Sequence, residues 1–165
     1  MRKLFILVFL LGTFLPTPIS ATQSPLVKIR IAEATIQGLP TEHAILFNAN
    51  GDILARYDNG TADDVRIDTS VCQGCIMTHN HTLNASFSTA DVENAVRMKL
   101  SQVRVVEPDI TCVLTATSQH PFVDMELTED YPHSIDSIGA EDYGNWNGVW
   151  QHYAYLYGLH YGCSR

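Results

Sequence analysis

The segment EHAILFNANGDILARYDNG, residues 42–60, constrains the fold most strongly, because it has the pattern of two strands around a tight turn. Apolar residues lie on both sides of a short polar stretch, NANGD. Within that stretch the pair Asn50-Gly51 is a strong β-hairpin signal, since such turns need residues that tolerate positive φ angles. The sequence therefore predicts two neighbouring strands at this place.

An amphipathic helix is predicted to begin at Ser88. The pattern Ser-x-x-Asp, formed by Ser88 and Asp91, is that of a capping box, in which the two residues satisfy each other's backbone groups at the start of a helix. Apolar residues then recur at helical spacing: Val92, Val96, Leu100 and Val103. This stretch gives the clearest helical pattern in the chain.

The other segments predict further strands and a final helix. Residues 22–29 look like a loose N-terminus, and residues 29–40 fit either a strand or a short helix. Residues 65–70 have the pattern of a short strand, and residues 103–116 that of two strands. The tail, residues 149–161, carries aromatic residues at helical spacing. This order indicates an α/β domain, with α+β as the alternative.

The N-terminus has the layout of a secretory signal peptide. A basic start is followed by the apolar run LFILVFLLGTFL, residues 4–15, and then by TPISA, residues 17–21. Cleavage after Ala21 would leave a single domain, residues 22–165, in a secreted or periplasmic location. An uncleaved anchor is the alternative, but the run is shorter than the ~20 residues that a bilayer requires.

The charge of the mature chain limits its partners. Removal of Arg2 and Lys3 leaves eight basic residues against eighteen acidic ones, a net charge of −10. Such a protein repels phosphate backbones, so no nucleic-acid partner is expected. No block of basic residues indicates a membrane-binding patch after signal cleavage.

Four cysteines, Cys72, Cys75, Cys112 and Cys163, remain in the mature chain. Exported proteins usually oxidise their cysteines, and four of them allow three pairings. We predict a Cys112–Cys163 disulfide, which would anchor the tail to a core strand, while Cys72 and Cys75 are either paired with each other or free.

The stretch THNHT, residues 78–82, contains the residues most suited to chemistry. In an extended segment side chains alternate, so His79 and His81 point to the same side and can chelate one ion. Asp91, in the first turn of the predicted helix, is a candidate third ligand. A catalytic zinc needs about three protein ligands and a nearby carboxylate to handle a proton, and Glu42 is a candidate for that carboxylate.

Other interpretations of these residues remain open. A His-x-His pattern occurs by chance, and Ser88 with Asp91 caps a helix without any metal. A structural zinc site formed by Cys72-x-x-Cys75 with the two histidines is a further alternative. Glu33 is a rival to Glu42 as the catalytic base.

The order of these motifs resembles that of the JAB/MPN metalloproteases, which carry the JAMM motif. Glu42 precedes a strand, THNHT follows, and Ser88-x-x-Asp91 opens a helix. In particular, EHAILFNANGDIL with THNHTLNASFSTAD is similar to segments of phage head-morphogenesis and toxin-associated C-terminal domains. The resemblance covers the motif core, residues 42–106. Thr82 stands where these families usually have proline.

The resemblance implies a zinc hydrolase on a central mixed sheet flanked by helices, an architecture similar to that of cytidine deaminases. It implies that His79, His81 and Asp91 bind Zn²⁺, that Glu42 activates water and that Ser88 stabilises the oxyanion. The substrate would be an amide or isopeptide bond in a protein or peptide. The alternative is a non-catalytic exported module, of toxin-associated, immunity or interaction type, on the same fold. The sequence does not fix the oligomeric state.

Overall fold

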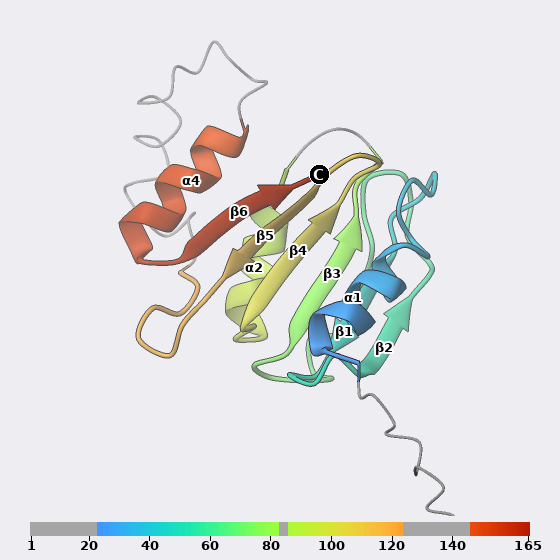
Figure 1. The fold of residues 1–165 in the computed structure, drawn as a ribbon, viewed down its shortest axis with the longest axis horizontal. Helices are drawn as coiled ribbons and strands as arrows, with labels where there is room; N and C mark the ends of the chain where they lie inside the picture. Colours follow the sequence, from blue (N-terminus) through green and yellow to red (C-terminus); the bar gives the residue numbers. More distant parts are fainter. Residues whose placement is uncertain (1–22, 83–85, 124–145) are drawn as a thin grey trace, which may run out of the picture.

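The computed structural model describes residues 23–82, 86–123 and 146–165, and these form one sheet with helices on both faces (Figure 1). The sheet has six strands in the order β2-β1-β3-β4-β5-β6. Strands β3 and β4 run parallel, and every other neighbouring pair runs antiparallel. The prediction of an α/β fold with a mixed sheet flanked by helices is therefore confirmed. The elements in chain order are α1 (Pro25–Glu33), β1 (Ala44–Phe47), β2 (Ile53–Tyr57), β3 (Ile76–Asn80), α2 (Thr89–Arg97), β4 (Gln102–Val106), β5 (Thr111–Thr115), α4 (Trp146–Tyr157) and β6 (His160–Ser164).

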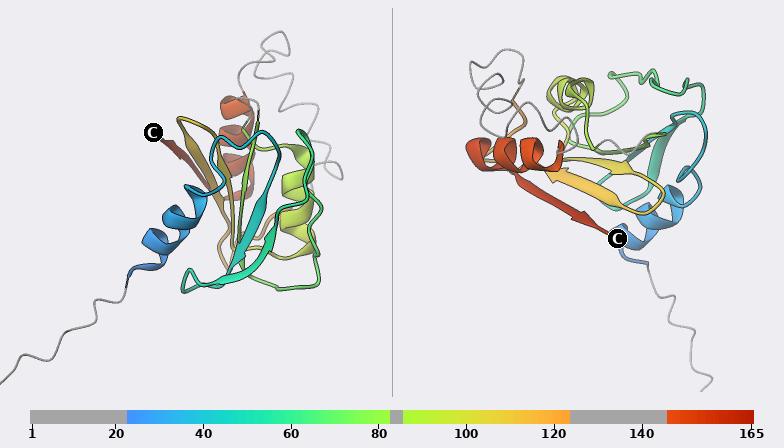
Figure 2. Two further views of the ribbon diagram at one scale, coloured as in Figure 1. Left: turned by 90° about the vertical axis from the view of Figure 1, so that its right-hand side faces the viewer. Right: turned by 90° about the horizontal axis from the view of Figure 1, so that it is seen from above.

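The sheet divides the apolar core into two layers, each covered by helices. Helix α1 covers one face of the sheet, and α2 covers the other (Figure 2). The larger cluster of buried residues combines sheet residues such as Met77 and Leu114 with Val92 of α2 and Trp150 of α4. The smaller cluster combines residues of α1 with residues of β1 that point the other way, such as Ile45. The alternation of side chains along the strands thus sends neighbouring residues into different layers.

The predicted hairpin is confirmed. Strands β1 and β2 pair antiparallel, and the turn between them is closed by the Asn48 side chain, whose Oδ1 atom accepts hydrogen bonds from the backbone N–H groups of Asn50 and Asp52. Gly51 has a φ angle of 74°, which explains why a glycine is favoured at this position.

Helix α1 begins earlier than the sequence indicates. We expected a loose chain through residue 29, but Pro25 is the first helical residue and the Ser24 side chain accepts a hydrogen bond from Val27 N at 3.4 Å. A serine N-cap followed by proline is a strong helix start, and it resolves the choice between strand and helix. Residues 65–70, predicted as a strand, form no strand.

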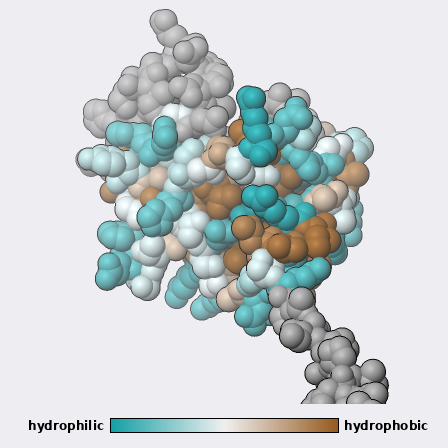
Figure 3. All heavy atoms as spheres, viewed as in Figure 1, coloured by the Kyte–Doolittle hydropathy of each residue, from teal (hydrophilic) through white to brown (hydrophobic). Residues whose placement is uncertain are grey.

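The outer side of α1 faces solvent although it is apolar. Leu26, Val27 and Ile31 are all exposed, and apolar side chains gather over this helix in the surface view (Figure 3). Helix α1 therefore contributes one buried edge to the core, and none of the residues that the structure describes covers its other side.

The helix predicted for residues 149–161 is replaced by a helix and a strand. Helix α4 ends at Tyr157, and the chain then returns as β6 to pair with β5. Gly158, with a φ angle of 66°, makes the break, because a positive φ ends a helix. Similarly, α2 ends at Arg97, so Val103 lies in β4 rather than in the helical stripe.

The predicted Cys112–Cys163 disulfide is present and joins register partners of β5 and β6. Cys72 and Cys75 are also bonded to each other. These sulfurs are consequently not available for a Cys2His2 zinc site. Two disulfides suit an oxidising compartment. The proposed signal peptide, residues 1–21, lies outside the described residues, and no helix in the described part of the chain has the length and apolarity to cross a membrane.

Candidate functional site

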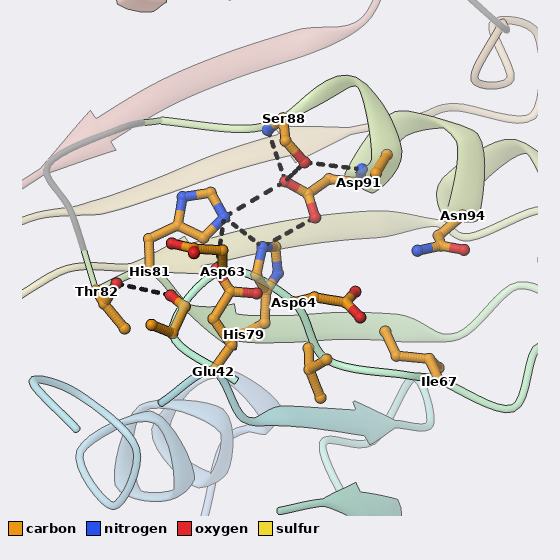
Figure 4. Close-up of a pocket in the computed structure, with 13 residues that line it drawn as sticks. Glu42, Asp63, Asp64, Ile67, His79, His81, Thr82, Ser88, Asp91 and Asn94 are labelled. Atoms are coloured by element: carbon orange, nitrogen blue, oxygen red, sulfur yellow. Dashed lines mark hydrogen bonds and ion pairs between the residues drawn. The ribbon is translucent and has the colours of Figure 1, made fainter. Parts of the chain in front are cut away.

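The two histidines lie at the end of β3 and face the same side of the sheet, as predicted (Figure 4). His79 is the fourth residue of the strand and His81 follows its last residue. Both are buried, with exposed fractions of 2% and 8%. Thr78 points to the opposite face, where its hydroxyl donates to a carboxylate oxygen of Glu33 in α1. Strand alternation alone therefore places both imidazoles on the α2 side.

Asp91 is aimed at the histidines by the cap of α2. The backbone N–H and the hydroxyl of Ser88 donate to Asp91 Oδ2 at 2.7 and 2.8 Å, and the Asp91 N–H donates to Ser88 Oγ at 3.3 Å. These contacts form the predicted capping box. They hold one carboxylate oxygen at the helix start and leave Oδ1 directed toward His79.

The three side chains converge on one point (Figure 4). His79 Nε2 lies 3.0 Å from Asp91 Oδ1 and 3.0 Å from His81 Nε2, and His81 Nε2 lies 3.6 Å from Asp91 Oδ2. Ligand atoms on one tetrahedral zinc, each about 2.0–2.1 Å from the ion, stand about 3.4 Å apart. One donor atom from each residue lies within 4.8 Å of the others. The set of two imidazoles and a carboxylate fits zinc.

The electrostatics of the cluster favour an ionised aspartate. Burial alone would raise the pKa of Asp91, but the charges of His79 and His81 and their hydrogen bonds hold that pKa well below its usual range. The Asp91 carboxylate is therefore ionised, which is the form that binds metal. His79 Nδ1 is the one buried side-chain nitrogen or oxygen of the described residues with no hydrogen-bond partner. The acceptor that commonly orients a metal-binding histidine is therefore not seen at His79.

Glu42 faces this cluster from the chain before β1. Its Oε1 atom lies 3.9 Å from His81 Nε2, and its backbone N–H donates to Thr61 O at 2.7 Å. Burial raises the pKa of Glu42, although the charges of His81 and His79 act in the opposite direction. Gly60 lets the chain before Thr61 pass close to the backbone of Glu42, because a Cβ atom at Gly60 would lie 2.0 Å from Glu42 O. The carboxylate is thus beside the three candidate ligands without being one of them.

Asn80, between the two histidines, connects Glu42 to the site. Its Oδ1 accepts from the backbone N–H of His43 at 2.8 Å, and its Nδ2 donates to Thr41 O at 3.0 Å. These bonds hold both neighbours of Glu42 against the end of β3. Asn80 was not predicted to have a role in the site; its position opposite the histidines on an alternating strand was the available signal.

Glu33, the rival base, lies on the other face of the sheet. Its carboxylate receives hydrogen bonds from Arg104 Nε and Nη2, at 2.5 and 3.1 Å, and from the Thr78 hydroxyl at 3.0 Å. It therefore forms a buried ion pair under α1, and of the two rivals for the base only Glu42 lies beside the histidines.

A cavity of about 210 Å³ opens over the cluster. Ser88 and Thr82 line it, together with two acids that no sequence motif indicated, Asp63 and Asp64. The Thr82 hydroxyl donates to Ala62 O at 2.8 Å and so ties the chain after His81 to the loop that bears these acids. No spacing rule connects that loop to the histidines, so only the fold could reveal it. The Ser88 hydroxyl lies at the cavity but is directed to Asp91 Oδ2.

Comparison of the chain with protein families, with curated proteins and with solved structures gave no match.

Proposed function

We propose that the protein is a zinc-dependent hydrolase of the JAB/MPN type that acts on an amide or isopeptide bond. One observation carries the proposal: His79, His81 and Asp91 converge at ligand distances, with the Glu42 carboxylate 3.9 Å from His81 Nε2 in a cavity. Two imidazoles, one carboxylate and an adjacent acid are the groups that a hydrolytic zinc site requires.

The mechanism assigns one task to each residue. His79, His81 and Asp91 would hold Zn²⁺, which polarises a carbonyl and lowers the pKa of water. Glu42 accepts the proton of the attacking water and returns it to the leaving amine nitrogen. Because burial raises the pKa of Glu42, its carboxylate is a stronger proton acceptor than an exposed glutamate. Ser88 lies at the cavity as the candidate donor to the oxyanion.

The location and substrate belong to the same proposal. The N-terminal signal pattern and the two disulfides support a secreted or periplasmic protein. A protein or peptide supplies the scissile amide. The acidic chain, with a formal net charge of −8 before signal removal, does not favour nucleic acid.

The metal content of the purified protein tests this proposal. We expect about one zinc per chain by elemental analysis of protein that has met no chelator, as in mononuclear catalytic sites. The double variant His79→Ala/His81→Ala should lose the zinc, because two of three ligands are gone. The matched control is His160→Ala, which removes an exposed imidazole of β6. Zinc on less than about a tenth of wild-type chains contradicts the proposal.

A non-catalytic module on the same fold is the second candidate. The observation that favours it is the Ser88 hydroxyl, whose proton is donated to Asp91 Oδ2 at 2.8 Å and is therefore not offered to a substrate oxyanion. A library of peptides and of lysine-linked isopeptides distinguishes the two candidates. Zinc-loaded wild type should cleave members of it, whereas a binding module should cleave none.

A further inference from the structure

The segment just before α2 is held by residues from the far C-terminus. Trp150 of α4 donates its indole N–H to Phe87 O at 2.9 Å. The Phe87 ring makes edge contacts with the rings of Trp150 and Tyr161, at centroid distances of 5.8 and 6.2 Å. Ser86 and Phe87, which precede the helix cap Ser88, are both buried. Residues more than sixty positions away in sequence therefore fix the entry to the helix that carries Asp91.

The hydroxyl of Tyr161 makes the polar part of this contact. It lies 3.3 Å from Ser86 Oγ and 3.0 Å from Cys163 Sγ. A disulfide sulfur carries no hydrogen and can only accept. The arrangement that satisfies these contacts has Ser86 donating to Tyr161 and Tyr161 donating to the disulfide, since Cys112 Sγ also lies 3.8 Å from the phenol oxygen. Burial raises the pKa of Tyr161, so the phenol keeps the proton that this requires.

The disulfide fixes the position of Tyr161. Cys163, two residues after Tyr161 on β6, is bonded to Cys112 of β5, and Cys112 is 2% exposed. Strand β6 is at the edge of the sheet and is hydrogen-bonded on one side to β5. The covalent bond therefore joins the edge strand to a buried residue of β5, close to the contact of Tyr161 with Ser86.

We propose that Tyr161 is a positioning residue of the metal centre, and that it acts through Ser86 to set the place of the Ser88–Asp91 cap. The inference rests on the proposed zinc site. The Asp91 carboxylate is aimed by two hydrogen bonds from Ser88, two residues beyond Ser86. A shift of residues 86–88 would move those donors. The distance between Asp91 Oδ1 and His79 Nε2, 3.0 Å in this structure, would then change. Partners outside the ligand set commonly tune metal affinity in this way.

A double-mutant cycle on zinc affinity tests the inference. Ser86→Ala and Tyr161→Phe each remove one side of the same hydrogen bond, while Tyr161→Phe keeps the ring against Phe87. We expect each variant to raise the zinc Kd about 3- to 10-fold, the effect of one hydrogen bond, in competition with a chelator. The double variant should be no weaker than the weaker single variant, because the second change has nothing left to remove.

Two controls separate positioning from general stability. Tyr155→Phe alters an exposed tyrosine of α4 and should leave the zinc Kd unchanged. Cys112→Ala/Cys163→Ala should weaken zinc binding at least as much as Tyr161→Phe, whereas Cys72→Ala/Cys75→Ala, which also loses a disulfide, should not. Hydrogen exchange of the Ser88 and Asp91 amides should speed up in Tyr161→Phe before any metal is added.

The possible failures are distinguishable. If wild type binds zinc and the Tyr161 and Ser86 variants bind it equally well, the inference is overturned and the proposed function stands. Effects of the two variants that multiply in the double variant also overturn it, because the residues then act separately. A lower melting temperature with an unchanged Kd assigns Tyr161 a structural role only. Wild type without zinc overturns the site and this inference together.

Discussion

The variant Glu42→Gln is expected to hydrolyse the amide or isopeptide substrate about 10²–10⁴-fold more slowly than wild type, the usual cost of a lost general base. The amide side chain has nearly the shape of the carboxylate but accepts no proton at neutral pH. Glu42 is not one of the three candidate ligands, although its carboxylate lies 3.9 Å from His81 Nε2. The zinc content of the variant should therefore stay near one per chain.

The measurement is kcat with zinc-loaded protein, beside elemental analysis of the same sample. Glu93→Gln is the matched control, since Glu93 lies on α2, forms an ion pair with Arg97 and is not among the residues lining the cavity. It should keep wild-type activity. A Glu42→Gln variant that retains full activity excludes Glu42 as the base, and with Glu33 committed to Arg104 the catalytic mechanism would have to be abandoned.

The variant Asp91→Asn is expected to weaken zinc binding by more than the 10–100-fold that follows loss of a residue outside the ligand set. A neutral amide oxygen is a poorer zinc ligand than a carboxylate, and the substitution also removes the negative charge that would offset the charge of the ion. Asparagine still accepts hydrogen bonds from the Ser88 backbone and hydroxyl, so the cap of α2 should survive. The readout is the zinc Kd, together with the melting temperature.

Ser88→Ala separates the two roles of Asp91. It removes the hydroxyl of the N-cap, which costs on the order of 1 kcal/mol of stability, but it leaves the Asp91 carboxylate in place. We therefore expect Ser88→Ala to lower the melting temperature more than Asp91→Asn does, and to weaken zinc binding less. The reverse order of zinc affinities would show that Asp91 serves the helix cap and not the metal.

Local signals in the sequence determined much of the site. Alternation along an extended segment placed His79 and His81 on one side, and the spacing Ser88-x-x-Asp91 placed a carboxylate in the first turn of a helix. Asn50-Gly51 likewise fixed the β1–β2 hairpin. Each of these features depends on residues within a few positions of one another, so backbone geometry alone decides them.

Longer-range questions were decided by packing. The sequence left Glu33 and Glu42 as rivals for the base, and the answer came from the pairing of Arg104 with Glu33 across 71 positions on the opposite face of the sheet. The tail has aromatic residues at helical spacing past Tyr157, yet residues 160–164 form a strand because β5 offers an unoccupied edge and Gly158 ends the helix.

The contact of Tyr161 with Ser86 spans 75 positions and had no local signal. By itself the sequence determined which residue types could bind a metal and which side of a strand they occupy, whereas the Cys112–Cys163 pairing was one of three that it allowed until the structure showed the bond. Only the tertiary structure decided which acid faces them and which residues hold Asp91 in place. The physical reason is that hydrogen bonds between distant segments depend on the order of the strands in the sheet, and that order follows from burial of the whole apolar surface rather than from any short pattern.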